Sequence, residues 1–591
     1  MLNKVYIIEK LPDIVPSFEG LVISLIPEVS HQLSKMGVAY SIPEDYLPMQ
    51  ELYSEMPAYI KLFDGWLNGL DETLWQHFKK LKVLNVKPAR LYGDYLGWII
   101  GSFVTNALFI KAILEKTKPS KVIYFHPEER SKPIGIEIWN EKETISSILI
   151  PLICKNKDIE LQEVIVGNVI NKKESKFNIK ITHLLYYLYK YYKLIKIFPS
   201  NILNIIFRQN AILSLHYFGW GIDEILHSAG RVGYQVLYVK SESFNEAVGY
   251  DVNLINETDL NMKLFNTFVG FDLSDVLKDK VKYFIEEIVP KLEVAIPKYQ
   301  ELFIKKRIAM VIGYSKDTFV QRSIIAAAVA STSTLAVLFT HGYDVFASPF
   351  MNSLSEGPCD LYLTFNEELK EFFSVSVFKK NDVIVEKAPL WVKKITNIRG
   401  SRKAVKPHGR PFVLYIPALL NGDFLRLDTS CYSSCWYFEH QMKLLEYFAR
   451  EQDFYFVWKG LPQSEKTKNP IPDVIKENGY DNIEFSFKRL NSCFIKADYA
   501  IMDYPSSALY EVAASGIPTL ALCHESFRIR KSAKALFGDI LEQFFTTEEA
   551  IWSIGKFLRS NPDHFLVNID LPEDIDFKVI ERHRKNKLHV R

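Results

Sequence analysis

Residues 497–526 read ADYAIMDYPSSALYEVAASGIPTLALCHES, and this stretch decides the fold class. Its composition predicts, in chain order, a buried strand (498–502), a turn (503–507), a helix (508–515) and a second strand (518–522). Gly516 stands where a residue in the left-handed region ends a helix, and Pro518 prevents the helix from continuing. Strand, helix and strand in this order predict a βαβ unit with parallel strands.

Two serines precede the helix of this unit. Unpaired backbone N–H groups and the helix dipole favour an anion there, and the hydroxyls of Ser506 and Ser507 can add hydrogen bonds to phosphate oxygens. Serine at this position also caps helices without any ligand, so both interpretations stay open. Glu511 lies one turn further on, on the same face as Ser507, where a carboxylate can accept hydrogen bonds from two sugar hydroxyls.

The composition is that of a large globular protein. With 591 residues, 48% of them hydrophobic, the chain can form about two to four domains. The formal net charge of +2 gives no chain-wide nucleic-acid surface, so no nucleic-acid partner is expected. Six scattered cysteines indicate a reducing, cytoplasmic environment. The first residues contain one short apolar run followed by acids, which predicts a strand and not a signal peptide, and no window reaches the roughly 18 uninterrupted apolar residues of a membrane helix.

Residues 1–167 alternate between strand-like and helix-like segments. Strands are expected at 5–9, 21–26, 38–42, 121–126 and 161–166, and helices at 72–81 and 98–116. No catalytic constellation occurs in this part of the chain. We therefore expect it to complete the sheet that continues at Ala211.

Residues 172–208 are an inserted segment of a different kind. No Asp or Glu occurs between Ser175 and Ile222, whereas lysines and aromatic residues alternate. This composition is typical of an interfacial helix on anionic lipid, and a buried aromatic helix with lysines reaching the surface is the alternative. The residues expected at the membrane surface are Lys190, Lys193, Lys196, Tyr191 and Tyr192.

The α/β pattern resumes at Ala211. The turn FGWGIDE (218–224) lacks the third glycine of a dinucleotide fingerprint, but Asp223 or Glu224 can face an acceptor pocket. His341 follows the predicted strand 334–340 directly. Its unperturbed pKa suits a general base or a phosphate contact, although a lone histidine is more often structural.

A second Rossmann-like domain follows a basic linker. Strands are expected at 412–416, 454–458 and 483–485, before the βαβ unit described above. Lys459 ends one of these strands, where it can contact a phosphate or simply lie on the surface. The chain ends in a basic tail that we expect to touch the same surface as the inserted segment.

These motifs resemble the GT-B glycosyltransferases. More narrowly, they resemble the bacterial capsule and lipopolysaccharide transferases of the Kdo and sialic-acid type and the CDP-glycerol glycerophosphotransferases. The matching residues are His341 and Gly342 for an HG motif, Asp503, Ser506 and Ser507 for a D-Y-S-S-like turn, and Glu511, Gly516 and Pro518 for an E…G-x-P motif. One departure is that Trp458-Lys459-Gly460 replaces the His-Pro expected after the middle strand of the second domain.

The resemblance implies an α/β fold with two Rossmann-like domains facing across a cleft. The implied parts are an acceptor domain (1–390) carrying the inserted segment (172–208), a linker (391–410), a nucleotide-donor domain (411–575) and a basic tail (576–591). The implied activity is transfer of a sugar from a CMP- or other NDP-sugar donor to a lipid-linked or polysaccharide acceptor during surface-glycan synthesis. The enzyme would work at the inner face of the cytoplasmic membrane.

In this scheme the donor phosphates bind at the start of the helix beginning at Ser507, where Lys459 stabilises the leaving group. The acceptor hydroxyl loses its proton to one of four candidate residues: His341, Asp344, Asp223 or Glu224. No Asp-x-Asp motif ends a predicted strand, so we expect neither a metal nor another cofactor. The alternatives are a CDP-glycerol-type glycerophosphotransferase, a GT-B-fold sugar-nucleotide epimerase and a non-enzymatic assembly or export partner.

Overall fold

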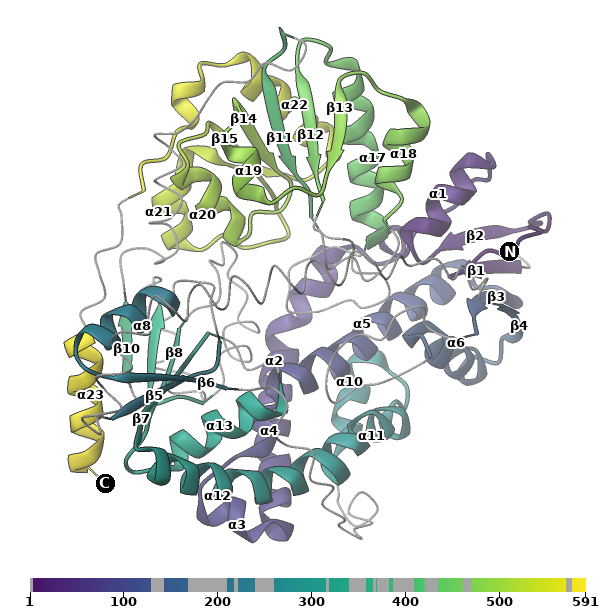
Figure 1. Cartoon of the computed structure of the whole chain (residues 1–591). Helices are drawn as coiled ribbons and strands as arrows, with labels where there is room; N and C mark the ends of the chain where they lie inside the picture. The colour runs from purple at the N-terminus through teal and green to yellow at the C-terminus, as the bar shows by residue number, and fades with distance from the viewer. Residues whose placement is uncertain are drawn as a thin grey trace.

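Three sheets of parallel strands, covered by helices, form the protein in its computed structural model (Figure 1). The described residues are 4–128, 143–167, 210–216, 222–239, 260–314, 318–339, 358–364, 368, 382–385, 409–418, 420, 434–460, 469–569 and 577–590. Two of the sheets have Rossmann-like strand orders. The predicted α/β class with two Rossmann-like domains is therefore confirmed, and a smaller third sheet is added to it.

The C-terminal sheet has the order β13-β12-β11-β14-β15-β16. Its strands are β11 (Phe412–Ile416), β12 (Tyr455–Lys459), β13 (Ile483–Ser486), β14 (Tyr499–Met502), β15 (Thr519–His524) and β16 (Leu541–Phe544). Its helices include α17 (Ser434–Arg450), α18 (Ile471–Asn478), α19 (Leu490–Phe494), α20 (Ser507–Ala514), α21 (Lys531–Phe537) and α22 (Thr547–Arg559). This is the dinucleotide-binding order 3-2-1-4-5-6, whose direction reverses between β11 and β14. The βαβ unit predicted around Ser507 is confirmed as β14-α20-β15.

The middle sheet has the order β10-β9-β8-β7-β5-β6. Its strands are β5 (Ala211–Ser214), β6 (Gln235–Tyr238), β7 (Ile308–Gly313), β8 (Leu335–Phe339), β9 (Leu361–Thr364) and β10 (Asp382–Val385). The helices of this part include α8 (Ile222–Arg231), α10 (Asn266–Val269), α11 (Ser274–Tyr283), α12 (Val289–Lys306) and α13 (Phe319–Ala330). The order is of the flavodoxin type, in which the direction reverses between the first and third strands, here β5 and β7.

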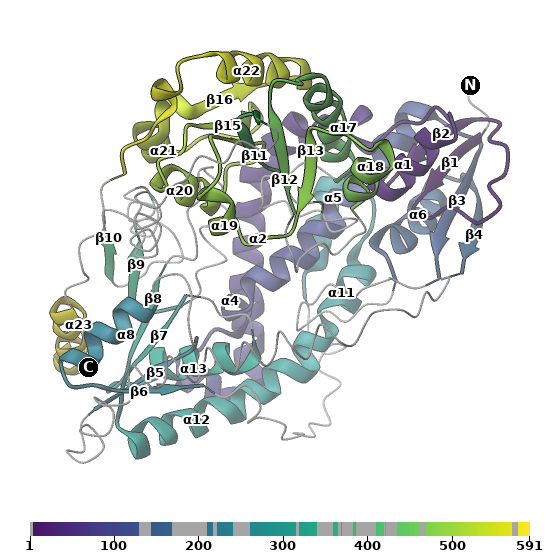
Figure 2. The same cartoon turned by 45° about the horizontal axis from the view of Figure 1, so that its top comes forward.

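Four strands between residues 4 and 166 form a separate third sheet (Figure 2). Its order is β2-β1-β3-β4, with β1 (Lys4–Ile8), β2 (Leu21–Ser24), β3 (Lys121–Pro127) and β4 (Glu160–Val166); α1 (Pro27–Lys35) and α6 (Ile145–Asn156) accompany these strands. The expectation that this part completes the sheet continuing at Ala211 is wrong, because among the described strands β1 to β4 pair only with one another. Residues 38–42 are not a strand either; Ser41 makes only an isolated bridge to Ile23.

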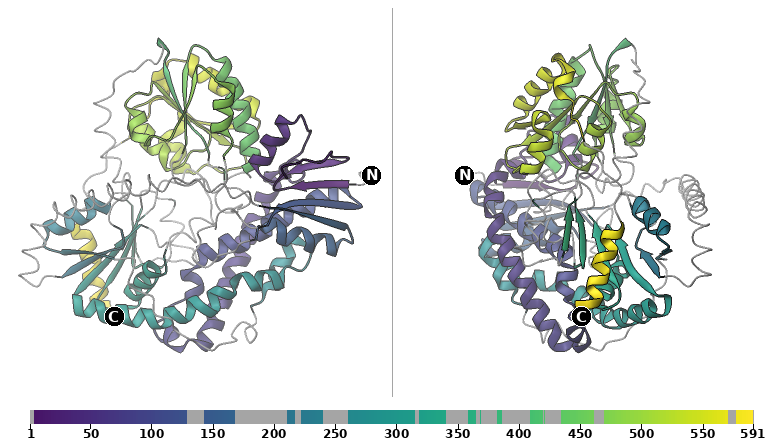
Figure 3. Two further views of the ribbon diagram at one scale, coloured as in Figure 1. Left: turned by 45° about the vertical axis from the view of Figure 1, so that its right-hand side comes forward. Right: turned by 90° about the vertical axis from the view of Figure 1, so that its left-hand side faces the viewer.

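A layer of long helices connects the N-terminal and middle parts. It contains α2 (Met49–His77), α3 (Lys79–Val83), α4 (Pro88–Leu91) and α5 (Gly93–Thr117), which pack against α10, α11 and α12 (Figures 1 and 3). Helix α5 is the one candidate membrane span within the described residues by length and composition, and 78% of its most apolar stretch is buried inside the protein. Its packing in this layer accounts for its apolar sequence.

A buried ion pair fixes this layer to the middle domain. Arg322 of α13 is fully buried, and its guanidinium donates to both carboxylate oxygens of Asp94 at 2.8 and 2.9 Å. It also donates to the carbonyl oxygen of Leu91 at 2.6 Å and lies over the rings of Tyr92 and Tyr95. The bidentate geometry fixes the angle between α5 and α13.

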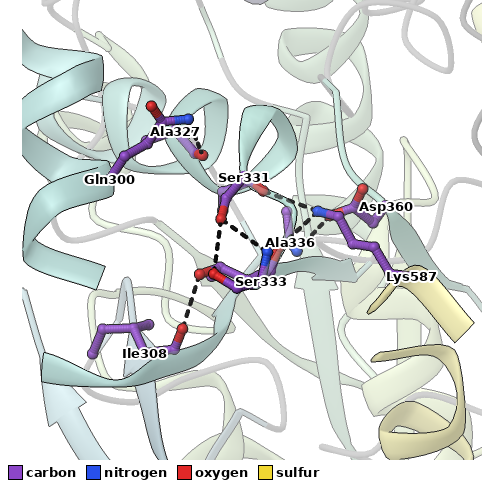
Figure 4. Close-up of polar contacts among 10 residues, drawn as sticks. Gln300, Ile308, Ala327, Ser331, Ser333, Ala336, Asp360 and Lys587 are labelled. Carbon is purple, nitrogen blue, oxygen red and sulfur yellow. Dashed lines mark hydrogen bonds and ion pairs between the residues drawn. The ribbon is translucent and has the colours of Figure 1, made fainter. Parts of the chain in front are cut away.

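The C-terminal residues return to the middle domain. Helix α23 (Phe577–Val590) buries Phe577 and Ile580 against the middle sheet and lies beside it in Figure 3. The Lys587 ammonium donates to Asp360 Oδ2 at 2.6 Å in a pair that is almost completely buried (Figure 4). The predicted basic tail is thus a docked helix, and Lys587 is not available to a membrane surface because it compensates a buried carboxylate.

We expect Arg322→Met to lower the free energy of unfolding by about 3–5 kcal/mol, because it leaves the Asp94 carboxylate buried without its partner. The double variant Arg322→Met/Asp94→Leu should recover most of this loss. Lys35→Gln, which removes a half-exposed pair with Glu477, should cost no more than about 1 kcal/mol. Urea unfolding measures all three; equal costs for the buried and the exposed pair would contradict this account.

Candidate functional site

The carboxyl ends of β11 and β14 meet at the point where the C-terminal sheet reverses its strand order. Open α/β sheets bind ligands at such points, outside the ends of the strands. Asp503 directly follows β14, and its carboxylate accepts a hydrogen bond from the backbone N–H of Ala418, in the loop that follows β11. Tyr415 Oη donates to it at 2.6 Å and Gln441 Nε2 at 3.2 Å.

Asp503 therefore has a positioning role. Its side chain is 1% exposed, and burial raises its pKa to about 7, although the three hydrogen bonds favour the charged form. In the structure this carboxylate fixes the turn between β14 and α20, and its expected part in donor binding stays a prediction. The sequence did not single out Tyr415 or Gln441, because their role depends on a partner distant in the chain.

The N-terminus of α20 begins four residues beyond Asp503. Ser506 is the N-cap residue, and its Oγ accepts a hydrogen bond from the backbone N–H of Ala508 at 3.4 Å. Ser506 and Ser507 are both partly exposed, so their hydroxyls can reach a ligand as well as the helix. Gly516 has φ +72°, as expected for the residue that ends this helix.

Glu511 lies on α20 one turn beyond Ser507. Burial raises the pKa of its carboxyl to about 7. Within the described part of the chain, no hydrogen bond or ion pair involves this carboxylate. A desolvated carboxylate of this kind is suited to accept hydrogen bonds from ligand hydroxyls, and this role stays a prediction for Glu511.

Lys459 is the last residue of β12, beside β11 in the sheet. Its side chain is 7% exposed, and its ammonium donates to the carbonyl oxygen of Gly460. Burial lowers the pKa of this ammonium. Gly460 has no room for a side chain, since a Cβ would lie 2.5 Å from the ring of Phe485. The interpretation of Lys459 as an ordinary surface lysine is therefore wrong; it is a buried cation at the ligand edge of the sheet.

The middle domain presents a second group of polar residues at its own reversal point. His216 follows β5 and stacks on Tyr314, which follows β7, with ring centroids 3.8 Å apart. The Gln321 amide lies 3.2 Å from His216 Nε2 and donates to the carbonyl oxygen of Leu215 at 3.3 Å. The sequence did not single out His216. A polar residue that interrupts an apolar run near its carboxyl end is the signal that could have found it.

The other predicted residues are only partly placed. Asp223 and Glu224 lie in the first turn of α8, and their side chains lie outside the described residues. His341, Gly342 and Asp344 also lie outside them, just beyond the end of β8. So do the membrane-surface residues of the segment 172–208. No cluster of three His, Cys, Asp or Glu side chains suited to a metal ion occurs in the described parts.

A hydrogen bond links the two Rossmann-like domains. Ser532, in the segment that follows β15, donates its backbone N–H to Glu368 Oε1 at 2.7 Å, and Glu368 follows β9. This hydrogen bond links the first turn of α21 (Lys531–Phe537) in the C-terminal domain to Glu368 of the middle domain.

Comparisons with known proteins give distant similarity only. No family model matches the chain, and no curated protein matches it. The S. aureus MnaA–UDP structure is 12% identical with a TM-score of 0.38, covering 65% of this chain and 98% of that chain. A Neisseria meningitidis UDP-GlcNAc 2-epimerase bound to UDP-GlcNAc is 15% identical with a TM-score of 0.38, covering 64% and 100%. An α,α-trehalose 6-phosphate synthase from Burkholderia multivorans is 12% identical with a TM-score of 0.36, covering 64% and 95%. Similarities at this level concern the fold and carry no argument about the reaction.

The Glu511 carboxyl predicts a specific pH dependence of stability. Its pKa is raised from 4.5 to about 7, so the folded state binds more protons than the unfolded state between these values. Stability should therefore fall as pH rises from about 4.5 to 7, by about 1–3 kcal/mol, and Glu511→Gln should remove this part of the fall. Relative to wild type, the variant should be more stable at pH 8.

Urea unfolding at pH 5 and pH 8 measures this difference. The raised pKa of Asp503 lowers the stability of wild type and variant by similar amounts as pH rises, so its contribution cancels in the comparison. Glu525→Gln is the matched control, because Glu525 is exposed in the same domain. Identical pH dependence of wild type and Glu511→Gln would contradict the placement of Glu511 in a desolvated site.

Proposed function

We propose that this protein is a glycosyltransferase that moves a sugar from a CMP- or other NDP-sugar to a lipid-linked or polysaccharide acceptor in surface-glycan synthesis. One observation carries the proposal: the N-terminus of α20 and the Glu511 carboxylate lie together at the reversal point of a sheet with the dinucleotide-binding order. An anion site and a hydroxyl site one helical turn apart suit the phosphates and the ribose of a nucleotide.

The donor would bind with its phosphates at the backbone N–H groups and hydroxyls of Ser506 and Ser507. Glu511 would accept hydrogen bonds from the ribose hydroxyls. Lys459 would stabilise negative charge on the departing nucleotide, and its burial strengthens this interaction because the local dielectric is low. These groups are preorganised, since the strand ends fix their backbone positions.

The acceptor would bind on the middle domain, at the carboxyl ends of its strands. His341 would remove the proton of the acceptor hydroxyl, with Asp344, Asp223 and Glu224 as the other candidates. His216 lies at the same edge of the same sheet and belongs with this group. We propose that the chemistry needs neither metal nor cofactor; transfer should persist in EDTA, and its loss in EDTA with recovery in Mg²⁺ would contradict this.

Nucleotide binding tests the donor site. Calorimetry with CMP, CDP and UDP should detect at least one ligand, and Ser506→Ala/Ser507→Ala should weaken it about tenfold or more, because two hydrogen bonds to a charged group are lost. Ser560→Ala, which removes an exposed hydroxyl far along the same domain, should leave the affinity unchanged. Unchanged affinity in the double serine variant would show that the nucleotide binds elsewhere.

The products distinguish the candidate reactions. With a nucleotide-sugar donor and an acceptor glycan or lipid-linked acceptor, the proposed enzyme forms an extended acceptor and releases the nucleotide. An epimerase would convert the donor without any acceptor, a glycerophosphotransferase would require CDP-glycerol, and a non-enzymatic partner would bind no nucleotide. Any one of these three outcomes would contradict the proposed glycosyltransferase activity.

We further propose that residues 172–208 hold the enzyme at the inner face of the cytoplasmic membrane, near its lipid-linked acceptor. The composition of this segment supports the proposal: it is basic and aromatic and contains almost no acids. Sedimentation with anionic liposomes should weaken when Lys190, Lys193 and Lys196 become Glu. Binding that is equal for the variant, or equal on neutral liposomes, would contradict an electrostatic attachment.

A further inference from the structure

A cavity of about 320 Å³ lies between the N-terminal part of the chain and the C-terminal domain. Residues 40–45, which follow β2 and α1, form one wall. Helices α17 and α22 form the others, and α1 lies against α17 in the same region (Figure 1). The cavity therefore exists only because the N-terminal sheet is docked on the C-terminal domain, and its volume is within the range of small-molecule sites.

The mouth of this cavity is polar and charged. Asp45 and Lys443 are exposed lining residues, and Lys443 Nζ lies 2.9 Å from a carboxylate oxygen of Glu548. Further in, Tyr40 Oη donates a hydrogen bond to Glu439 Oε1 across the boundary between the two parts of the chain. Burial raises the pKa of the Glu439 carboxyl. The lining thus holds carboxylate acceptors and one ammonium donor, with an excess of negative charge.

The closed end of the cavity contains His440, which is 1% exposed. Its Nδ1 lies 3.0 Å from Thr547 Oγ1, and its ring stacks on those of Trp436 and Phe544, at centroid distances of 5.0 and 5.3 Å. Burial lowers its pKa to about 3, so the imidazole is neutral. Among the described residues, its Nε2 has no hydrogen-bond partner. A buried polar atom of this kind is unusual in a folded protein.

We propose that this cavity is a saccharide-binding subsite that takes one neutral, polyhydroxylated sugar unit and is separate from the donor site. Carboxylates accept hydrogen bonds from sugar hydroxyls, and an ammonium donates to them, so one ring can satisfy both kinds of group. An anionic sugar would meet the Asp45 and Glu439 carboxylates, and an apolar ligand would leave the polar lining without partners. The partly exposed indole of Trp436 supplies the apolar wall that the carbon face of a sugar requires.

Helix α17 connects the subsite to the reversal point of the C-terminal sheet. Glu439, His440 and Lys443 line the cavity from α17, and Gln441 of the same helix donates to Asp503 and to the carbonyl oxygen of Ala418. A glycan held by the cavity would therefore lie beside the catalytic domain without occupying the donor site. The inference concerns binding and does not depend on the proposed transfer reaction.

Saturation-transfer NMR with the full chain tests the subsite. The probes are the methyl glycosides of glucose, galactose and N-acetylglucosamine at millimolar concentration, with gluconate as the anionic counterpart. At least one neutral glycoside should receive saturation, and gluconate should not. Glu439→Gln should weaken binding about tenfold, because a hydrogen bond to a charged group is lost. Asp45→Asn, at the exposed mouth, should weaken it in the same direction.

The matched control is Glu446→Gln, an exposed carboxylate on the same helix, which should bind as wild type does. Thermal unfolding checks that each variant is folded. If Glu439→Gln does not fold, Asp45→Asn still tests the subsite. The proposal is overturned if no neutral glycoside binds, if gluconate binds as well, or if both carboxylate variants bind as wild type does. It is also overturned if Ser506→Ala/Ser507→Ala abolishes the signal, because the sugar would then occupy the donor site.

Discussion

The hydrogen bonds of the Asp503 carboxylate are the constraint on which the candidate site depends. They join the turn after β14 to the loop after β11, across the point where the C-terminal sheet reverses its order. Because α20 begins only four residues later, this contact fixes where the backbone N–H groups of the helix point. The carboxylate is buried, and burial raises its pKa; its hydrogen bonds offset much of the cost of placing it there. Asp503 thus fixes the position of Ser506 and Ser507 without lying in the helix itself.

Polar contacts between segments distant in the chain join the other parts of the molecule to one another. The pair of Arg322 and Asp94 joins the helical layer to the middle domain, and Lys587 with Asp360 joins the C-terminal helix to the same domain. The hydrogen bond between Ser532 and Glu368 links the C-terminal and middle domains. Buried pairs of this type add little net stability but specify one arrangement strongly, because removing either partner leaves a charge without compensation.

The sequence predicted the local structure around the candidate site well, and the site itself stays a prediction. The elements around Ser507, the left-handed Gly516 and the strand end at Lys459 follow from apolar runs and turn residues, which act over a few positions. What it could not predict depends on pairing between distant residues. The N-terminal sheet is separate because among the described strands β1 to β4 pair only with one another, which the sequence of each strand does not encode. Asp503 is a positioning residue because Tyr415 lies 88 positions away, and the cavity at Glu439 needs Tyr40 from 399 positions away.

Amide hydrogen exchange of the full chain with and without nucleotide tests the central claim most directly. If the N-terminus of α20 binds the donor phosphates, the nucleotide that binds among CMP, CDP and UDP should slow exchange most strongly at residues 503–511, with a second effect at 459–460. The cavity at Glu439 and His440 should exchange as it does in the free protein. Slowed exchange confined to other segments, or none at saturating nucleotide, would contradict the placement of the donor site on this helix.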